Sequence, residues 1–387
     1  MITINKRIIG LDALRSFALF MVLFGHNATL FNPLIHLPII GNLAGKALAI
    51  HEIIGFSGVE IFFVLSGFLI TDIVFKYFNN NRNNFAQLKL FLIRRWLRTL
   101  PNYYFMYIVN TILYVWILKE KTFDWKFILF IQNLNYPHPD FYREAWSLAT
   151  EEWFYCLLPI ILIAIYNFKK LDFKNSILLT CLLMFLFSFA LKIFHIQQYG
   201  IHLNFDENIR KVVLLRFDNL IIGILCYVCF YYYNTLFLKY KNWLFWFGLL
   251  LIIPTVPLFY AAYQNKFYLY HHNNLIAIYC NFIFLPTLGF ITALIIPKLY
   301  YLNLDKQKYL SAFFKKSSQL AYSMYLINLP IYKLFFFRNN LIPDSIGSSI
   351  MYILLFLLIN YGIAQLIYKY IESPFLKYRD RKYPNVY

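Results

Sequence analysis

The chain has 387 residues, of which 60% are hydrophobic, 21% are aromatic and only 14% are charged. Because one water-soluble core cannot bury that much apolar surface, the composition excludes an ordinary soluble protein and predicts an all-α, polytopic membrane protein. The formal net charge of +18 is spread over several separate segments, which indicates membrane topology and attraction to anionic membrane lipid and disfavours nucleic-acid binding.

Ten apolar stretches approach the ~20 residues that are needed to cross a hydrocarbon core. In chain order, the predicted spans are 8–30, 53–75, 101–118, 148–166, 176–194, 212–233, 243–262, 276–297, 319–337 and 348–371. Lys and Arg are concentrated in alternate connecting segments, so we expect both the N-terminus and the C-terminus to be cytoplasmic. Because the connections are short, residues 1–387 are predicted to form a single membrane domain without a separate soluble domain.

The first predicted span carries two basic side chains, Arg15 and His26, within the apolar run IIGLDALRSFALFMVLFGH. Their separation corresponds to about three helical turns, so the two side chains share one helix face and lie about 16 Å apart along its axis. Ionisable groups inside a membrane helix indicate function by default. Because this stretch is long and contains Arg15, we do not expect it to be a cleavable signal peptide.

Arginine residues gather at the cytoplasmic ends of the first and third predicted spans. Arg95 and Arg98 are three residues apart and therefore project from one helix face, and Arg15 is expected at a similar depth. Arginine binds phosphate oxygens in a bidentate manner, so the cluster predicts a site for a phosphate-bearing cytosolic ligand. The alternative interpretation is that these arginines only anchor the topology.

A second group of ionisable residues lies near the outer ends of the predicted spans. The group consists of His26, Glu60, Glu151, Glu152, Arg216 and Asp218. A desolvated histidine beside a carboxylate suits acid and base chemistry, because burial and neighbouring charge set its affinity for a proton. The alternative is a set of buried interhelical hydrogen bonds, and Arg216 with Asp218 would form either a substrate contact or a structural lock.

Two further pairs of residues each allow two interpretations. Ser66 and Gly67 either line a channel for a ligand or permit close packing of two membrane helices. Trp146 and Ser147 either contact a substrate or, as tryptophan often does, mark the membrane interface. No metal site is predicted.

Seven local strings stand in order along the chain. They are GLDALRSFALFMVLFGH, FSGVEIFFVLSGFLIT, FLIRRWLRTLPNYY, AWSLATEEWFY, RFDNLIIG, LAYSMYLINLP and IESPFLKY. Together these strings resemble the motifs of the acyltransferase 3 family of integral-membrane acyltransferases, and the resemblance extends over nearly the whole chain.

The resemblance implies transfer of an acyl group, commonly acetyl, from cytosolic acyl-CoA to a hydroxyl group of a carbohydrate or glycolipid of the cell envelope. It implies that His26 is the catalytic base or a transient acyl acceptor. Glu151 or Glu152 would orient the imidazole or bind the sugar, and the sequence does not decide between them. The expected location is the cytoplasmic (inner) membrane of a bacterium.

The same resemblance assigns the remaining candidates to the two substrates. The phosphates of coenzyme A are expected among Arg15, Arg95 and Arg98, with Ser66 and Gly67 beside the acyl-bearing arm. The residues expected to bind the acceptor are Glu60, Trp146, Ser147, Arg216 and Asp218.

The chain departs from the family pattern at two positions. Asn328 stands where many members have a histidine, and Glu60 stands where aspartate is commoner. The alternative function is a proton-coupled transporter or flippase of an envelope precursor, in which His26, Glu60 and Glu151 would relay protons. The sequence contains no inverted pair of broken helices to favour it, and only acyl transfer consumes acyl-CoA.

Overall fold

The computed structural model describes residues 7–35, 44–78, 85–117, 119, 124–168, 171–266 and 274–384. Every regular element in these ranges is a helix, and none of the described residues forms a strand. The predicted all-α fold is therefore confirmed.

The longer helices are α1 (Ile9–His26), α3 (Ala44–Phe78), α4 (Phe85–Ile112), α5 (Ala145–Phe168), α6 (Phe173–Tyr199), α7 (Asp218–Tyr232), α8 (Asn234–Leu250), α9 (Ile252–Lys266), α11 (Leu285–Tyr300), α12 (Lys308–Ile331) and α13 (Ile346–Ile367). The shorter elements are η1 (Ala28–Phe31), α2 (Asn32–Ile35), η3 (Leu113–Ile117), η4 (Trp125–Leu129), η5 (Asp206–Arg210), η6 (Val213–Leu215), α10 (Asn274–Ile278), η7 (Tyr279–Phe284), η8 (Tyr332–Phe337), η9 (Tyr368–Glu372) and α14 (Ser373–Lys382). Several boundaries follow from local chemistry: α13 begins at a capping box formed by Ser345 and Ser348, and α6 ends at Gly200, whose φ is +83°.

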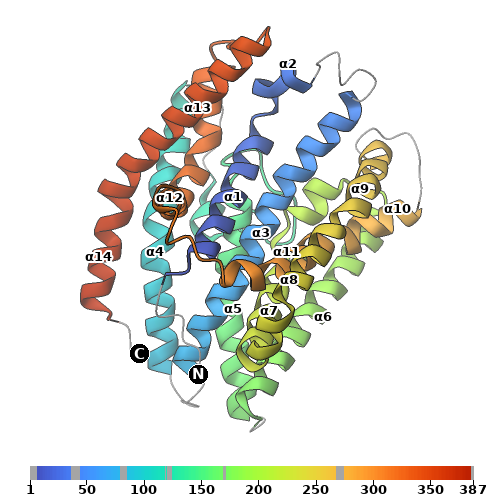
Figure 1. Cartoon of the computed structure of the whole chain (residues 1–387), viewed down its shortest axis with the longest axis vertical. Helices are drawn as coiled ribbons and strands as arrows, with labels where there is room; N and C mark the ends of the chain where they lie inside the picture. The colour runs from blue at the N-terminus through green and yellow to red at the C-terminus, as the bar shows by residue number, and fades with distance from the viewer. Residues whose placement is uncertain are drawn as a thin grey trace.

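The helices pack around a central pair, α1 and α3. Helices α13 and α14 form one edge of the bundle, while α6, α8 and α9 lie towards the opposite edge (Figure 1). Helix α1 packs against α3 and α12, α3 packs against α7, and α12 packs against α13. The first helix thus packs against other helices on more than one side.

Two crossings in the centre of the bundle depend on glycine. At the first, Gly25 of α1 meets Gly55 of α3, and a Cβ atom added to Gly25 would lie 2.4 Å from the Cα of Gly55. At the second, a Cβ atom added to Gly67 of α3 would lie 2.1 Å from the carbonyl oxygen of Leu220 in α7, and Gly223 approaches α3 in the same way. No side chain fits in either place, so these glycines permit the close backbone contact that is common between membrane helices.

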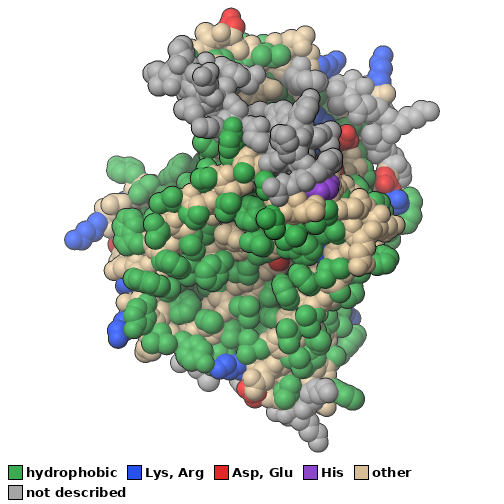
Figure 2. All heavy atoms as spheres, turned by 90° about the vertical axis from the view of Figure 1, so that its right-hand side faces the viewer, with side chains coloured by type: hydrophobic (Ala, Val, Ile, Leu, Met, Phe, Trp, Pro, Cys, Tyr) green, Lys and Arg blue, Asp and Glu red, His purple; other side chains and the backbone are tan. Residues whose placement is uncertain are grey.

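One side of the molecule is covered by apolar side chains, with the charged side chains mainly near its margins (Figure 2). Helix α6 contributes large exposed hydrophobic residues along its whole length, including Leu182, Phe185, Phe189 and Phe194. Soluble proteins rarely expose an apolar surface of this extent. The surface is therefore that of an integral membrane protein.

Seven helices of the described chain are long and apolar enough to cross a membrane, and the shorter apolar helix α7 accompanies them. The seven are Ile9–His26, Ala49–Phe78, Ala145–Phe168, Phe173–Tyr199, Asn234–Ala261, Asn274–Tyr300 and Ile346–Lys382. The difference from the ten predicted spans lies in α7, which is short, and in α4 and α12, which are helical but less apolar. Helix α4 contains Arg95 and Asn102, and α12 contains Asn328. The total of ten and the cytoplasmic position of both termini stay predictions.

Candidate active site

A cavity of about 150 Å³, which we call the main cavity because it holds the predicted polar residues, lies between α1, α3, α4, α5 and α12 of the described structure. Its wall contains Arg15 from α1, Arg95 and Arg98 from α4, and Glu151 from α5. These side chains come from segments far apart in the sequence, and the bundle brings them to one space. The cavity thus combines the predicted phosphate-binding arginines with one of the two predicted catalytic glutamates.

Glu151 is the centre of the polar contacts in this cavity. One carboxylate oxygen accepts a hydrogen bond from Ser66 (Oγ–Oε1 2.8 Å). The other accepts from the Tyr155 hydroxyl at 2.9 Å and pairs with the Arg95 guanidinium at 3.3 Å. The Arg95 guanidinium also lies 3.9 Å from the centre of the Tyr155 ring. These contacts fix both side chains, because a guanidinium held by a carboxylate and an aromatic face has little freedom.

A second cavity, of about 210 Å³, adjoins the first and shares Arg95 and Arg98 with it. Arg94 of α4 and Arg379 of α14 are added to its wall. Asp380 pairs with both of these arginines, at 3.1 Å from Arg94 and 2.8 Å from Arg379. The two cavities together form a polar space whose end towards α14 is strongly cationic.

Arg98 differs from its neighbours because its side chain is exposed to this space. Within the described part of the chain, no hydrogen bond or ion pair occupies its guanidinium group. A guanidinium that faces a cavity in this way can donate hydrogen bonds to two oxygens of a phosphate.

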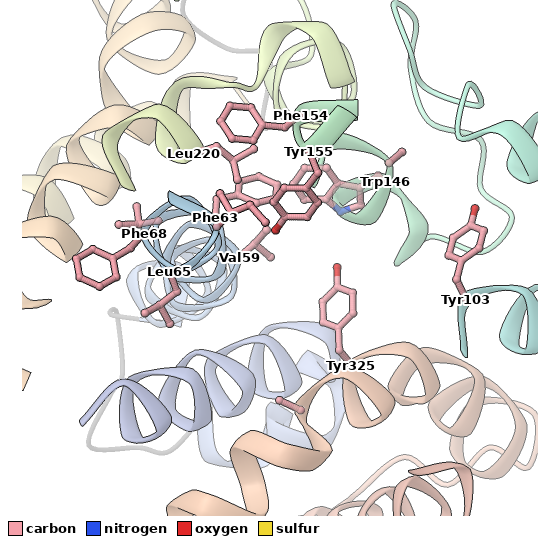
Figure 3. Close-up of a cluster of buried hydrophobic side chains, with 14 of the residues drawn as sticks. Val59, Phe63, Leu65, Phe68, Tyr103, Trp146, Phe154, Tyr155, Leu220 and Tyr325 are labelled. Carbon is pink, nitrogen blue, oxygen red and sulfur yellow. The ribbon is translucent and has the colours of Figure 1, made fainter. Parts of the chain in front are cut away.

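The opposite end of the main cavity is formed by Tyr325 of α12 and Ser147 of α5. Their hydroxyl oxygens are 2.6 Å apart, and the Tyr325 hydroxyl also donates to the carbonyl oxygen of Glu144 at 3.2 Å. Tyr325 reaches from α12 towards the side of the cluster formed by Val59 and Trp146 (Figure 3). Tyr325 is therefore the part of the cavity wall that approaches His26.

His26 lies next to Tyr325, and the centres of the two rings are 6.5 Å apart. It is half-buried at the C-terminal end of α1, and it is not among the described residues that line the main cavity. Its Nδ1 atom lies 2.7 Å from Oδ1 of Asn328. Arg15 and His26 are on one unbroken helix, as predicted, so the distance between them along the axis is about 16 Å.

The two predicted glutamates have different surroundings although they are adjacent in the chain. Glu151 faces the cavity, whereas Glu152 is buried, interacts with Thr99 of α4, and is absent from the walls of both described cavities. Successive residues of a helix point about 100° apart, so only one of the two can face the same space. Neither carboxylate makes a described hydrogen bond to His26.

Three of the predicted acceptor-binding residues lie together, away from the described cavities. Glu60 and Arg216 are fully buried and form an ion pair at 2.7 Å. Arg216 also lies 3.4 Å from Asp218, which in turn pairs with Lys192 of α6 at 3.5 Å. Asn219 of α7 donates hydrogen bonds to Glu60 and to a backbone carbonyl of α11. This network joins α3, α6, α7 and α11.

Of the remaining predicted residues, some line the main cavity and others are buried in helix contacts outside it. Ser66 and Ser147 line the main cavity, whereas Gly67 lies at the crossing of α3 and α7. Trp146 is buried, with its indole 4.7 Å from the Arg210 guanidinium carbon and edge-on to Phe63. Among the described residues, no group of three His, Cys, Asp or Glu side chains is arranged to hold a metal ion.

Sequence reasoning missed three residues of this site, namely Tyr155, Tyr325 and Arg379, and it singled out Asn328 without assigning it a contact. The two tyrosines carry no recognisable signal, because the chain contains 33 tyrosines. Tyr155 lies one helical turn after Glu151, so a search for hydrogen-bonding partners at that spacing would have found it. Arg379 is distant in sequence from α4, and only the packing of α14 against α4 reveals its contribution.

The chain is similar to curated O-acetyltransferases over part of its length. It is 37% identical over 134 residues to the peptidoglycan O-acetyltransferase OatA of Listeria monocytogenes, an alignment that covers 30% of this chain and 21% of that protein. It is 31% identical over 178 residues to the putative peptidoglycan O-acetyltransferase YrhL of Bacillus subtilis, which covers 41% of this chain and 24% of that protein. A putative O-acetyltransferase of Staphylococcus aureus is 30% identical over 156 residues, covering 35% of this chain and 26% of that protein.

In these alignments the chain spans about a quarter of the length of its curated relatives. No solved structure matches the chain. The family comparison, in contrast, covers nearly the whole sequence, because residues 8–369 match the acyltransferase 3 family, which is described as an acyltransferase domain. The chain therefore belongs to the acyltransferase 3 family of membrane acyltransferases.

Proposed function

We propose that the protein is a membrane O-acyltransferase that moves an acyl group, acetyl in the first instance, from cytosolic acyl-CoA to a hydroxyl group of an exported carbohydrate. The observation that carries the proposal is the joined cavity, which is cationic at one end and ends at Tyr325, next to His26, at the other. An elongated donor with phosphates at one end and a thioester at the other has this distribution of charge.

The donor would bind with its phosphates at the cationic end. Arg15, Arg95 and Arg98 would contact phosphate oxygens, and Arg94 and Arg379 of the second cavity would extend the same site. The pantetheine arm would pass Ser66 in the main cavity and bring the thioester towards His26. Gly67 would act indirectly, by holding α3 against α7.

At the thioester, Nε2 of His26 would accept the proton of the acceptor hydroxyl. The oxygen would attack the carbonyl carbon, so that a C–O bond forms, the C–S bond breaks, and the released thiolate takes up a proton to give free CoA. In the other possible sequence, His26 takes the acyl group from sulfur first and then passes it to the hydroxyl. Glu151 would hold Arg95 and Tyr155 in place, while Ser147 would lie close to the reacting groups.

The acceptor is proposed from the relatives, whose names specify peptidoglycan O-acetylation. A glycan hydroxyl at the outer side of a bacterial inner membrane is the corresponding substrate, and a glycolipid is the other candidate. Both termini would then be cytoplasmic, so that α14 and Arg379 face the donor side. Trp146, Glu60, Arg216 and Asp218 would support the acceptor side through their buried contacts.

The experiment is the release of free CoA thiol from acetyl-CoA by the purified protein in nanodiscs, measured with and without soluble peptidoglycan fragments. We expect acceptor-dependent release, and we expect His26→Gln to reduce it by about 10²–10⁴-fold, because glutamine cannot take up a proton. Transfer of the acetyl group to the glycan is followed in parallel by mass spectrometry.

The matched control is His51→Gln. His51 is a buried histidine of α3 whose Nε2 contacts the carbonyl oxygen of Phe24 at 2.8 Å, a contact that glutamine can reproduce. We expect this variant to keep its activity within about threefold. Absence of thiol release with acetyl-, propionyl- and palmitoyl-CoA would contradict the proposal and would favour the transporter alternative.

A further inference from the structure

The side-chain amide of Asn328 lies between a backbone carbonyl group and an imidazole ring. It is fully buried on α12, and its Nδ2 group donates to the carbonyl oxygen of Tyr325. Its Oδ1 atom is 2.7 Å from Nδ1 of His26 on α1. The amide is thus the direct link between α12 and the histidine.

These two contacts determine which way the amide faces. A backbone carbonyl has no hydrogen to donate, so only the NH₂ group of Asn328 can bond to Tyr325. The carbonyl oxygen of the amide must then face His26, and because that oxygen can only accept, Nδ1 of His26 must carry the proton. The neutral imidazole consequently has its free lone pair on Nε2.

We propose that Asn328 is a positioning residue that fixes His26 in the Nδ1–H tautomer and directs the basic Nε2 atom away from α12. The geometry of the contact does not depend on the proposed acyltransferase function, but the catalytic value of the tautomer rests on it. If Asn328 is replaced by an apolar residue, the His26 ring loses the acceptor for its Nδ1–H group. Neither the tautomer nor the orientation of the ring is then fixed by this contact.

The structural part of the proposal is tested by NMR of protein labelled with ¹³C and ¹⁵N at histidine, in nanodiscs. The chain has eight histidines, and the signals of His26 are identified by their absence in His26→Gln. We expect the wild-type ring carbon and nitrogen shifts to report the Nδ1–H tautomer, and Asn328→Leu to shift them towards the Nε2–H form. A wild-type Nε2–H tautomer, or shifts unchanged in Asn328→Leu, would overturn the proposal.

The control for this substitution is Asn360→Leu. Asn360 is also fully buried and also donates to a backbone carbonyl of α12, that of Met324 at 3.4 Å, but it makes no described contact with His26. We expect Asn360→Leu to leave the His26 shifts in place. If both variants moved them equally, the effect would come from general loosening of α12, and the specific role of Asn328 would be wrong.

The catalytic part is tested by steady-state thiol release. We expect Asn328→Leu to lower kcat by about tenfold, the size expected for one lost hydrogen bond at the reacting group, with the KM for acetyl-CoA nearly unchanged. Asn328→His should recover most of kcat, because a neutral imidazole can also donate to the Tyr325 carbonyl and accept from His26. If Asn328→Leu shows the expected NMR shifts but an unchanged kcat, the tautomer has no catalytic role. The contact between Asn328 and His26 would still be established by the NMR result.

Discussion

At the scale of single residues, the adjacent glutamates show how a helix separates two similar side chains. Glu151 is held by Ser66, Tyr155 and Arg95 on the wall of the main cavity. Glu152 points towards α4 and is absent from the described cavity walls. A carboxylate that pairs with a cavity-lining arginine controls how that arginine meets a ligand, so we expect the two residues to respond differently to substitution.

Glu151→Gln should lower kcat/KM for acetyl-CoA by more than about tenfold. The change removes the negative charge that orients Arg95, and charge-assisted hydrogen bonds contribute about 1.5–3 kcal/mol. Glu152→Gln is the matched control and should change the same parameter by less than about threefold. The measurement is thiol release over a range of acetyl-CoA concentrations, and a larger effect at Glu152 would mean that Glu151 is not the important carboxylate.

At the scale of helices, the network around Glu60 and Arg216 joins α3 to α6 and α7. Both side chains of the central pair are fully buried, so each neutralises a charge that would otherwise be left without compensation. Desolvation makes such a pair a weak source of net stability, but the loss of only one partner is costly. The network therefore predicts a large effect for a single substitution and a small one for a paired substitution.

Arg216→Met should destabilise the protein by about 3–5 kcal/mol, because it leaves the Glu60 carboxylate buried without its partner. The double variant Glu60→Leu with Arg216→Met should recover most of that loss. Thermal unfolding in detergent micelles measures both, and Arg143→Ala is the control, since the exposed pair of Arg143 with Asp140 should contribute less than about 1 kcal/mol. If Arg216→Met were as stable as the wild type but bound the acceptor less well, Arg216 would contact the substrate and would not serve mainly to hold the helices together.

The turn η5, which lies outside the apolar spans, contains a second cluster of charges. Asp206 pairs with Arg210 and Lys211, both at 2.5 Å. Burial alone would raise the pKa of Asp206, but these two cations outweigh it and lower the pKa to about 2. Because the folded-state pKa lies below the ordinary value of ~3.9, the carboxylate stabilises the fold above about pH 4, and this contribution is lost as the pH falls towards 2.

Asp206→Asn should therefore lower stability at pH 7 by about 2 kcal/mol. The difference between wild type and variant should shrink as the pH is lowered from 5 to about 2, because the Asp206 carboxylate takes up a proton in the unfolded chain at a higher pH than in the folded protein. Thermal unfolding at a series of pH values measures this, with the exposed Asp140→Asn as a comparison. A difference that does not depend on pH would show that the loss comes from packing and not from the charge.

At the scale of the whole molecule, the sequence predicted the helical fold and several polar residues that line the main cavity. The spacing of Arg15 and His26, and of Arg95 and Arg98, needs only the helical repeat, and the structure places each pair as that repeat requires. Apolar length identified the seven helices of the described chain that are long and apolar enough to cross a membrane. The same criterion is weakest for α4 and α12, since helices that line a polar cavity lose apolar residues to that cavity.

What sequence could not predict is the partner of each polar residue. From the sequence, Glu60, Glu151 and Arg216 are all expected at a similar depth in the membrane. In the structure, however, Glu151 pairs with Arg95 of the cavity wall, whereas Glu60 and Arg216 neutralise each other. Which contacts form depends on the rotation of each helix about its axis and on its neighbours, and neither is encoded in local periodicity. The assignment of Asn328 to His26 likewise required the packing of α12 against α1.

The glycine crossings have a consequence for how a group can pass the membrane. Gly25 against Gly55, and Gly67 against Gly223, bring α1, α3 and α7 into backbone contact, so that sliding or rocking of these three helices would drive main-chain atoms into one another. They act as a stationary frame that carries both Arg15 and His26. Under the proposed function, a flexible arm of the donor would bridge the distance between the two residues without motion of this frame. The close contacts are then consistent with passage of a small chemical group in place of an entire molecule.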